Sequence, residues 1–285
     1  MIEIKNLTHT YKNNGIKTDA IKDINLTIPD GKITAVIGHT GSGKSTLIQH
    51  LNGLLKPDSG DILLDGISIY DSKKISMKEV RRKVGLVFQY PEYQLFEETV
   101  YKDIAFAPKN YGCTKEEIDE RVYSAAKAVG LKEVNLEKSP FELSGGQKRK
   151  AAIAGVLAMK PEVLVLDEPA AGLDPFGREK ILYEIGKICS EEAISVVLVS
   201  HSMEEVATCA HKIAVMYGGE IKMTGSPSEI FAKVKELEQM RLDIPQITKI
   251  LNELRLKGIP VPEDIFSVKE ASNWILKNIP VNKGI

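Results

Sequence analysis

The sequence contains few cysteines, and they are widely spaced. The three present are Cys113, Cys189 and Cys209, with no CxxC pair among them. Scattered thiols of this kind can build neither a disulfide framework nor a cysteine-rich zinc site, so both are excluded. A reducing cytosol is therefore the expected environment.

An excess of charge of either sign is also missing. Lys plus Arg number 38 and Asp plus Glu number 39, which leaves a formal net charge of −1. A chain this close to neutral has no strong field to attract a polyphosphate backbone, so nucleic acid is not an expected partner. Hydrophobic residues at 43% and charged residues at 27% exclude a disordered or low-complexity protein.

Long hydrophobic runs are missing as well. No stretch approaches the ~18 apolar residues that a membrane span needs. The segment from Met1 to Lys5 lacks the charged and apolar regions of a secretory signal. We therefore expect no membrane span and no export signal. At 285 residues the chain is long enough for roughly two structural units.

Three nearly continuous apolar runs predict buried strands, at residues 33–37, 163–166 and 195–199. Strands that are apolar on both faces are typical of a parallel sheet covered by helices. Shorter strands are expected in the first seventy residues, where Asp65 and Gly66 stand between two apolar runs and indicate a hairpin. The predicted fold class is α/β with an antiparallel β-subdomain.

Candidate capping boxes mark several expected helices. They pair Ser or Thr with Glu three residues later, at Ser76 with Glu79, Thr114 with Glu117, Ser226 with Glu229 and Ser267 with Glu270. After about residue 227 the strand signals end, and helices are expected at 230–240, 247–256 and 268–276. We predict an α/β domain over residues 1–225, with a helical subdomain at about 90–160, and a small helical domain over 226–285.

A glycine-rich segment between an expected strand and an expected helix matches a phosphate-binding loop. It fits the pattern GxxxxGK followed by Ser or Thr and consists of Gly38, His39, Thr40, Gly41, Ser42, Gly43, Lys44, Ser45 and Thr46. Its backbone N–H groups and the positive end of the helix dipole suit phosphate oxygens. Lys44 is expected to reach the β- and γ-phosphates of a nucleotide, and Ser45 to ligate Mg²⁺. A plain glycine-rich turn is the alternative.

Two carboxylates follow the strand expected at 163–166. Asp167 and Glu168 lie at its C-terminal end, where open α/β sheets bind ligands. Asp167 is predicted to hold the Mg²⁺ shell, and Glu168 to orient or deprotonate the attacking water. Alone the pair could belong to a solvated loop, but together with the phosphate loop it predicts nucleotide hydrolysis.

A second anion-binding helix start is expected after Leu143. Ser144, Gly145, Gly146 and Gln147 precede a helix predicted at 148–159. The resulting pentapeptide LSGGQ resembles the signature of the ATP-binding subunits of ABC transporters, and the resemblance covers residues 1 to about 225. It implies a head-to-tail dimer in which the signature of one subunit closes over ATP held by the other subunit.

The same resemblance implies roles for several further residues. Tyr11 corresponds to the aromatic that stacks on adenine, and Gln89 to the Q-loop glutamine that reaches Mg²⁺ and water. His201 corresponds to the switch histidine at the γ-phosphate, and Gly172 to Asp174 to the D-loop. His39 stands at a variable position of the phosphate loop, and its side chain is assigned no role.

Three segments resemble the ATPases of energy-coupling factor transporters, which import vitamins, cobalt or nickel. They are residues 89–100, Ala170 to Pro175, and Gln147 to Arg149, and they are most similar to the second of two paired paralogues. The resemblance implies a peripheral protein at the cytoplasmic face of the cell membrane. Its partners would be a second ATPase subunit, a transmembrane coupling subunit and a substrate-binding membrane subunit. The solute, and the choice between a homodimer and paired paralogues, stay open.

Two surfaces are expected to serve this assembly. Leu95 and Phe96 place apolar side chains in an expected surface loop, which indicates a groove for a coupling helix; folding back into the helical subdomain is the alternative. The resemblance implies that the C-terminal helices hold two ATPases together, and packing on their own ATPase domain is the alternative. Competing functions are a soluble ABC-type ATPase acting on nucleic acid or ribosomes, and an ATPase of another importer class.

Overall fold

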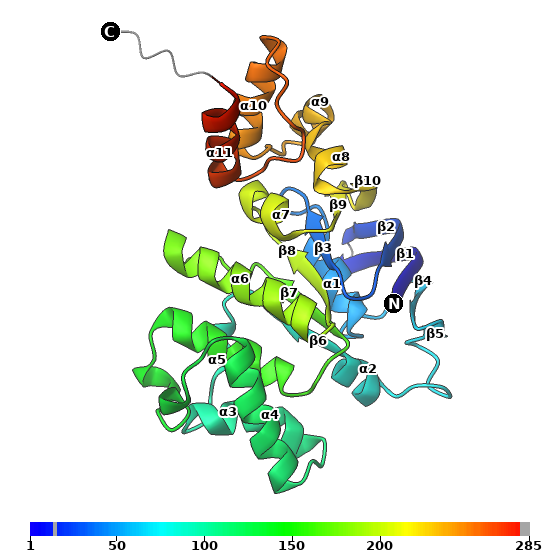
Figure 1. The fold of residues 1–285 in the computed structure, drawn as a ribbon. Coiled ribbons are helices and arrows are strands. Elements are labelled where there is room, and N and C mark those ends of the chain that lie inside the picture. The colour runs from blue at the N-terminus through cyan, green and yellow to red at the C-terminus, as the bar shows by residue number, and fades with distance from the viewer. Residues whose placement is uncertain (14–15, 280–285) are drawn as a thin grey trace.

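A central sheet of six strands organises the molecule (Figure 1), in a computed structural model that describes residues 1–13 and 16–279. The strand order is β10-β9-β3-β8-β7-β6, and all neighbours pair in parallel except β10, which runs antiparallel to β9. The strands are β3 (Ile33–Ile37), β6 (Val84–Val87), β7 (Val163–Asp167), β8 (Ser195–Val199), β9 (Lys212–Tyr217) and β10 (Glu220–Gly225). Every residue of β3, β7 and β8 is buried, as the apolar runs predict.

A smaller antiparallel sheet has the order β2-β1-β4-β5. Its strands are β1 (Ile2–Asn13), β2 (Ile16–Ile28), β4 (Ser59–Leu64) and β5 (Ile67–Ser68). Asp65 and Gly66 link β4 to β5 with φ angles of 52° and 77°, as the two central residues of a type I′ turn require. The predicted hairpin, the antiparallel β-subdomain and the α/β fold class are confirmed.

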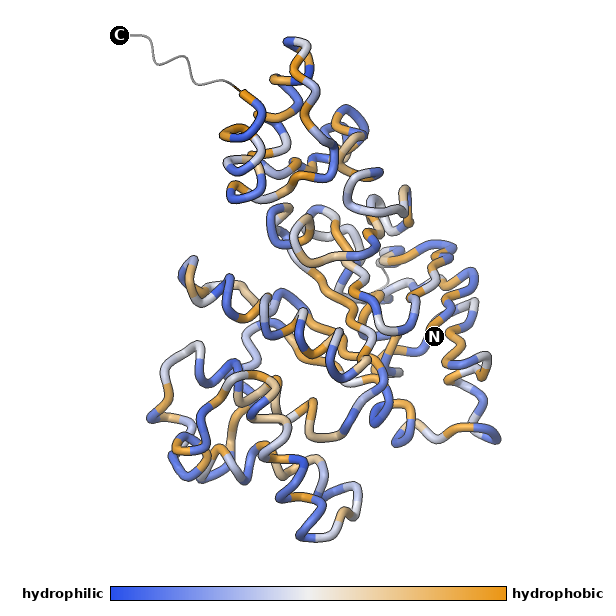
Figure 2. Tube along the Cα trace, viewed as in Figure 1, coloured by the Kyte–Doolittle hydropathy of each residue, from blue (hydrophilic) through white to orange (hydrophobic). Residues whose placement is uncertain are grey.

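Helices surround the sheets. Those of the first 210 residues are α1 (Lys44–Leu51), α2 (Met77–Lys83), α3 (Val100–Asn110), α4 (Lys115–Ala128), α5 (Gly145–Leu157), α6 (Pro175–Glu191) and α7 (Met203–Cys209). Three short 3₁₀ turns accompany them, η1 (Pro91–Gln94), η2 (Glu133–Asn135) and η3 (Pro140–Glu142). Apolar colours follow the strands of the larger sheet, whereas the outer helices alternate between apolar and polar residues (Figure 2).

The capping predictions are confirmed at three of the four positions. Thr114, Ser226 and Ser267 each form the reciprocal capping box with the expected Glu. At Ser76 the box is incomplete: the Ser76 side chain accepts the N–H of Glu79, but the Glu79 carboxylate turns to Arg82 at 2.6 Å. A charge-assisted bond to a guanidinium outcompetes the weaker bond to a backbone N–H.

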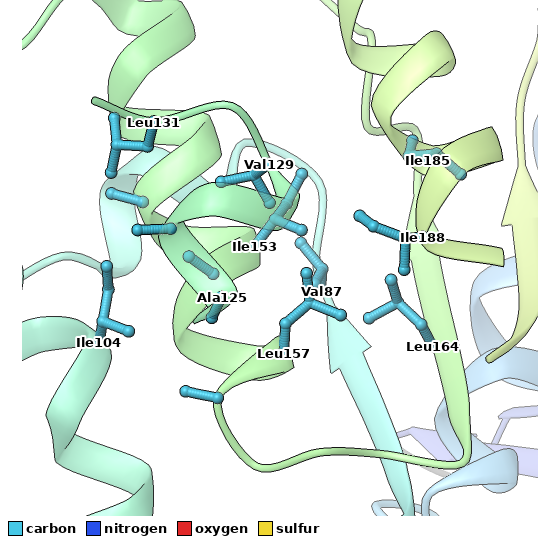
Figure 3. Packing of buried hydrophobic residues seen from close by; sticks show 14 of the residues in the cluster. Val87, Ile104, Ala125, Val129, Leu131, Ile153, Leu157, Leu164, Ile185 and Ile188 are labelled. Carbon is cyan, nitrogen blue, oxygen red and sulfur yellow. The ribbon is translucent and has the colours of Figure 1, made fainter. Parts of the chain in front are cut away.

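The helical region α3–α5 shares one apolar cluster with the sheet (Figure 3). Ile104, Ala125 and Ile153 come from its helices, and Val87 and Leu164 come from β6 and β7. Side chains of α6 complete the cluster on its other side. Because a single cluster spans helices and sheet, the helical region is held against the six-stranded sheet by burial as well as by the chain connections.

In the C-terminal sixty residues, of which the structure describes those up to Ile279, the helices expected at 247–256 and 268–276 are confirmed. The single helix expected at 230–240 is wrong, since the chain forms two shorter helices there. The helices are α8 (Pro227–Phe231), α9 (Val234–Gln239), α10 (Gln246–Leu256) and α11 (Val268–Asn278). The chain breaks between α8 and α9 because Phe231 and Leu237 both turn into one cluster with the sheet residues Ile37 and Val215.

Residues 230–244 thus pack on the sheet, whereas α10 and α11 enclose a small cluster of their own. That cluster buries Leu251, Val261, Ile265 and Ala271, with Trp274 half-buried beside it. Leu256 at 88% and Leu276 at 69% exposure stay open to solvent. Across residues 1–13 and 16–279, no helix has the length and apolar character to pass through a bilayer.

Candidate active site at the phosphate loop

Glycines shape the loop that joins β3 to α1. A Cβ atom on Gly38 would collide with the carbonyl oxygen of Met216 and the Ser42 side chain. Gly43 has a φ of 103° and precedes α1, and a Cβ on it would lie 2.5 Å from the carbonyl oxygen of Ala20. Only glycine permits this backbone path, which wraps the loop tightly at the helix start.

Lys44 is the first residue of α1 and is almost fully buried, at 6% exposure. Its Nζ donates hydrogen bonds to the carbonyl oxygens of Gly38 at 2.6 Å and His39 at 3.1 Å. Burial lowers the pKa of Lys44, while the carboxylates of Glu168 and Asp167 act in the opposite direction. The ammonium group is therefore held inside the loop, within the field of both acidic residues.

Two oxygen donors suited to Mg²⁺ stand side by side at this loop. Ser45 Oγ lies 3.5 Å from Asp167 Oδ2, which joins the start of α1 to the end of β7. Burial and the nearby Glu168 carboxylate raise the pKa of Asp167. Mg²⁺ is usually held by one or two protein oxygens, with waters and phosphates completing its shell, so Ser45 and Asp167 fit the ion. Larger groups of acidic, His or Cys ligands that could hold a metal are absent from the described part of the chain.

Glu168 is held between two of the predicted site residues. Its Oε2 accepts a hydrogen bond from Gln89 Nε2 at 2.8 Å, and its Oε1 lies 2.6 Å from His201 Nε2. The backbone of Glu168 has a φ of 49°, in the left-handed region that few residues other than glycine occupy. Its N–H donates to the carbonyl oxygen of Val199 at 2.9 Å. Backbone strain of this kind is typical of functional positions.

Two further predicted nucleotide residues, Tyr11 and His39, lie in the same region. Tyr11 is partly exposed, and its hydroxyl lies 3.3 Å from Thr46 Oγ1 at the start of α1. The Nδ1 atom of His39 bonds to the carbonyl oxygen of Thr40, and its ring packs edge-on against Tyr217. The role of Tyr11 in stacking on adenine stays a prediction, with its position beside α1 in its favour.

The signature residues lie apart from the phosphate loop, at the start of α5 in the helical region (Figure 1). Ser144 and Gln147 form a reciprocal capping box, with Gln147 Oε1 accepting the Ser144 N–H at 2.9 Å. Apart from the adjacent residues and the backbone of α5 itself, no described atom lies within 4 Å of a Cβ built on Gly145 or Gly146. This helix start is therefore open to an approaching group.

A second network, which was not predicted from the sequence, includes the residues on either side of His201. Ser200 Oγ donates to the buried carboxylate of Glu205 at 2.7 Å and accepts the N–H of Ser202 at 3.0 Å. Arg178 Nε lies 3.4 Å from the other oxygen of Glu205. A cavity of about 270 Å³ opens between this network and Glu168. No motif pointed to Glu205, because an acidic residue in the first turn of a helix is ordinarily a solvated dipole partner.

The two residues expected to form a docking groove behave differently from each other. Leu95 is half-buried and packs against the apolar cluster of the helical region, which is the alternative stated for it. Phe96 is 63% exposed and meets the ring of Phe106 edge-on at 5.0 Å. Tyr93, two residues before Leu95, is 84% exposed. Phe106 is 43% exposed, so the exposed aromatic side chains here include Tyr93, Phe96 and Phe106.

The site combines a phosphate loop after β3 with an Asp-Glu pair at the end of β7. A glutamine and a histidine contact the same glutamate, and a separate helix start carries LSGGQ. These features together are those of an ATP-hydrolysing subunit of an ABC transporter.

Comparison with known proteins agrees with this class and narrows it. The family profile of ABC transporters matches residues 21–171. The chain is 52% identical to the energy-coupling factor transporter ATP-binding protein EcfA2 of Caldanaerobacter subterraneus subsp. tengcongensis, over 100% of this chain and 99% of that protein. It is 54% identical to the EcfA2 protein of Clostridium tetani, over 97% of this chain and 96% of that protein. The chain belongs to the family of energy-coupling factor transporter ATP-binding proteins.

Solved structures show the same fold. CbiO1 from Clostridium perfringens, described as part of the ABC transporter complex cbiONQ, is 38% identical with a TM-score of 0.75, covering 88% of this chain and 98% of its own. The ATP-binding cassette MJ0796, solved as a dimer bound to ADP and Pi, is 30% identical with a TM-score of 0.70, covering 80% of this chain and 99% of its own.

Proposed function

We propose that this chain pairs head to tail with a second ATPase subunit and hydrolyses Mg-ATP at their interface to drive an importer. The observation that carries the proposal is the separation of two phosphate-binding helix starts. The start of α1 gathers the reacting groups around Lys44 and Glu168, whereas the start of α5 at Ser144 is open. A nucleotide on the first of these needs the second from another subunit. The dimeric state of the similar cassette MJ0796 supports this arrangement.

The hydrolytic step is assigned to residues around the γ-phosphate. Lys44 and the loop N–H groups neutralise the β- and γ-phosphates, so that charge developing on the leaving ADP is stabilised. Glu168 aligns a water molecule and accepts its proton as the oxygen attacks the γ-phosphorus and the bond to the bridging oxygen breaks. Gln89 and His201 hold the Glu168 carboxylate in position. Bound at Ser45 and Asp167, Mg²⁺ would supply positive charge to the phosphate oxygens.

The membrane partner is assigned to the exposed aromatic surface of Tyr93, Phe96 and Phe106. Exposed aromatics of this kind are enriched at protein interfaces, and an amphipathic helix of a transmembrane coupling subunit would cover them. The surface lies a few residues from Gln89, which bonds to Glu168. The chain would then work as a peripheral protein on the cytoplasmic face of the membrane, beside a separate membrane subunit that binds the solute.

The C-terminal helices α10 and α11 are assigned to contact between the two ATPases. Their own cluster buries few residues, while Leu256 and Leu276 remain exposed. A segment with so small a core gains stability when a second subunit covers its apolar side chains.

Complementation between two inactive variants tests the composite site. Lys44→Ala removes the phosphate contact of a chain, and Ser144→Arg blocks the open helix start with a large side chain. Each variant alone is expected to lose at least about 10²-fold in ATP turnover. In a mixture, mixed dimers regain one intact site, so turnover should rise well above that of either variant. Activity that stays at the level of the single variants after mixing would reject the head-to-tail site, provided that both variants remain folded and dimeric.

A further inference from the structure

Arg149, in the second turn of α5, is among the largest fully buried side chains described, at 2% exposure. Its guanidinium pairs with Glu92 of η1 through both terminal oxygens. Arg149 Nη2 lies 2.8 Å from Glu92 Oε1, and Nε lies 3.2 Å from Oε2. This two-point contact connects the helix that begins at the signature with the short turn that follows Gln89.

The same guanidinium also holds the chain just after Glu168. Arg149 Nη1 donates to the carbonyl oxygen of Pro169 at 3.0 Å and to that of Ala171 at 2.6 Å. These carbonyls follow Glu168 by one and three residues. A planar guanidinium can satisfy the carboxylate and the two carbonyls at once, whereas a lysine ammonium cannot match this fork.

A separate contact brings the same two segments together. Tyr90, with a φ of 55°, places its ring 3.6 Å from the position that a Cβ on Gly172 would take. Residues 90–96 and the turn 169–172 therefore lie side by side, with Arg149 bonded to both. The first segment carries the exposed Tyr93 and Phe96, and the second continues directly from Glu168.

Stability alone does not account for a buried charge at this place. Burying the charges of Arg149 and most of Glu92 is unfavourable, and apolar residues of similar size often give equal or greater stability. The pair does add geometric definition, because its bonds fix the distance between three elements of the chain.

We infer that Arg149 is a positioning residue that transmits movement of the docking segment 90–96 to the turn after Glu168. Displacement of η1 by a membrane partner pulls on Glu92, and the guanidinium passes the displacement to the carbonyls of Pro169 and Ala171. The alignment of Glu168 then depends on the position of the docking segment. The inference rests on the proposed docking surface, and it adds the residue that links that surface to hydrolysis.

The test uses the assembled transporter, with transport and ATP turnover measured together for Arg149→Lys and Glu92→Gln. Each variant should lower kcat about tenfold, leave KM for ATP within about twofold, and reduce the solute moved per ATP hydrolysed. The combined variant should lose little more than either single one, because both act through one contact. Stability by thermal unfolding is measured alongside.

Lys150→Gln serves as the matched control. Lys150 is the neighbouring residue of α5 and pairs with Glu184 at 3.8 Å, away from the turn after Glu168. It should lower stability without changing the ratio of transport to hydrolysis. If Arg149→Lys and Glu92→Gln lower only the unfolding temperature, as this control does, the inference is overturned. If wild-type turnover itself does not respond to the membrane subunits, the docking proposal fails instead.

Discussion

The N-termini of α1 and α5, the two proposed phosphate-binding sites, differ in how many residues of the same chain lie around them. At α1 the ammonium of Lys44 is buried, and the carboxylates of Asp167 and Glu168 stand beside it. At α5 the glycines after Ser144 have open space above them. The contrast supports the proposal that one chain supplies the reacting half of a site and a partner supplies the half that covers it.

The largest expected effect is a loss of ATP turnover when Glu168, beside the start of α1, is replaced. Glu168→Gln keeps the size of the side chain but removes the proton acceptor, so ATP turnover should fall by at least about 10²-fold, while ATP binding is retained. Single-turnover kinetics and equilibrium nucleotide binding check the two parts separately. Unchanged turnover in this variant would remove Glu168 from the reaction and leave the reacting half without its base.

The C-terminal helices provide the next largest effect. Replacing the exposed Leu256 and Leu276 by Glu should weaken the nucleotide-free dimer by about tenfold or more, since charge would enter a buried apolar contact. Light scattering across a dilution series measures the dissociation. Leu54→Glu, at a side chain that is 45% exposed on the ATPase domain, is the control and should leave the dimer unchanged. Equal dissociation constants for both variants would contradict the assignment.

A smaller effect is expected at the docking surface. Tyr93→Ser combined with Phe96→Ser should reduce co-purification of the membrane subunits several-fold, because apolar contact area is lost at the interface. Leu95 is left unchanged, since it packs inside the helical region. Val134→Ser, at a residue of the same region that is 67% exposed, should have no effect. Co-purification as strong as wild type in the double variant would place the partner elsewhere.

The smallest expected effect concerns Glu205, which bonds to Ser200 beside His201. Burial raises the pKa of Glu205, so the folded protein keeps that proton to a higher pH than the unfolded chain does. The corresponding stability is present at low pH and is lost as pH rises through the raised pKa. Glu205→Gln should match wild type in free energy of unfolding at about pH 4 and exceed it at about pH 8, where the wild-type carboxylate is charged. Denaturant unfolding at both pH values measures this.

The sequence predicted correctly those features whose interacting residues are close together in the chain. The phosphate loop lies within nine consecutive residues, and its glycines are required by the backbone path there. Asp167 and Glu168 follow a strand whose burial is visible as an apolar run. The capping boxes at Thr114, Ser226 and Ser267 span four residues each. Each of these features depends on residues that are close to one another in the sequence.

Contacts between distant segments were not predictable in the same way. Leu95 and Phe96 are adjacent and both apolar, yet only Leu95 turns into the cluster of the helical region. Arg149 appeared in the sequence as one more basic residue after the signature, with nothing to pair it with Glu92. Whether such side chains are buried, and which partners they have, depends on the elements that pack against them. The hydrophobic periodicity of the sequence does not contain that information.

The sequence by itself determined the family, the order of the nucleotide-binding motifs and the α/β fold class with its antiparallel β-subdomain. It could do so because these features depend on short motifs and on the burial of whole elements. Only the tertiary structure decided that Glu168 takes a left-handed backbone between Gln89 and His201, and that Arg149 joins the docking segment to the turn beyond it. Those arrangements arise because segments far apart in the chain pack together. Their burial, charge pairing and backbone strain then jointly set the position of each side chain.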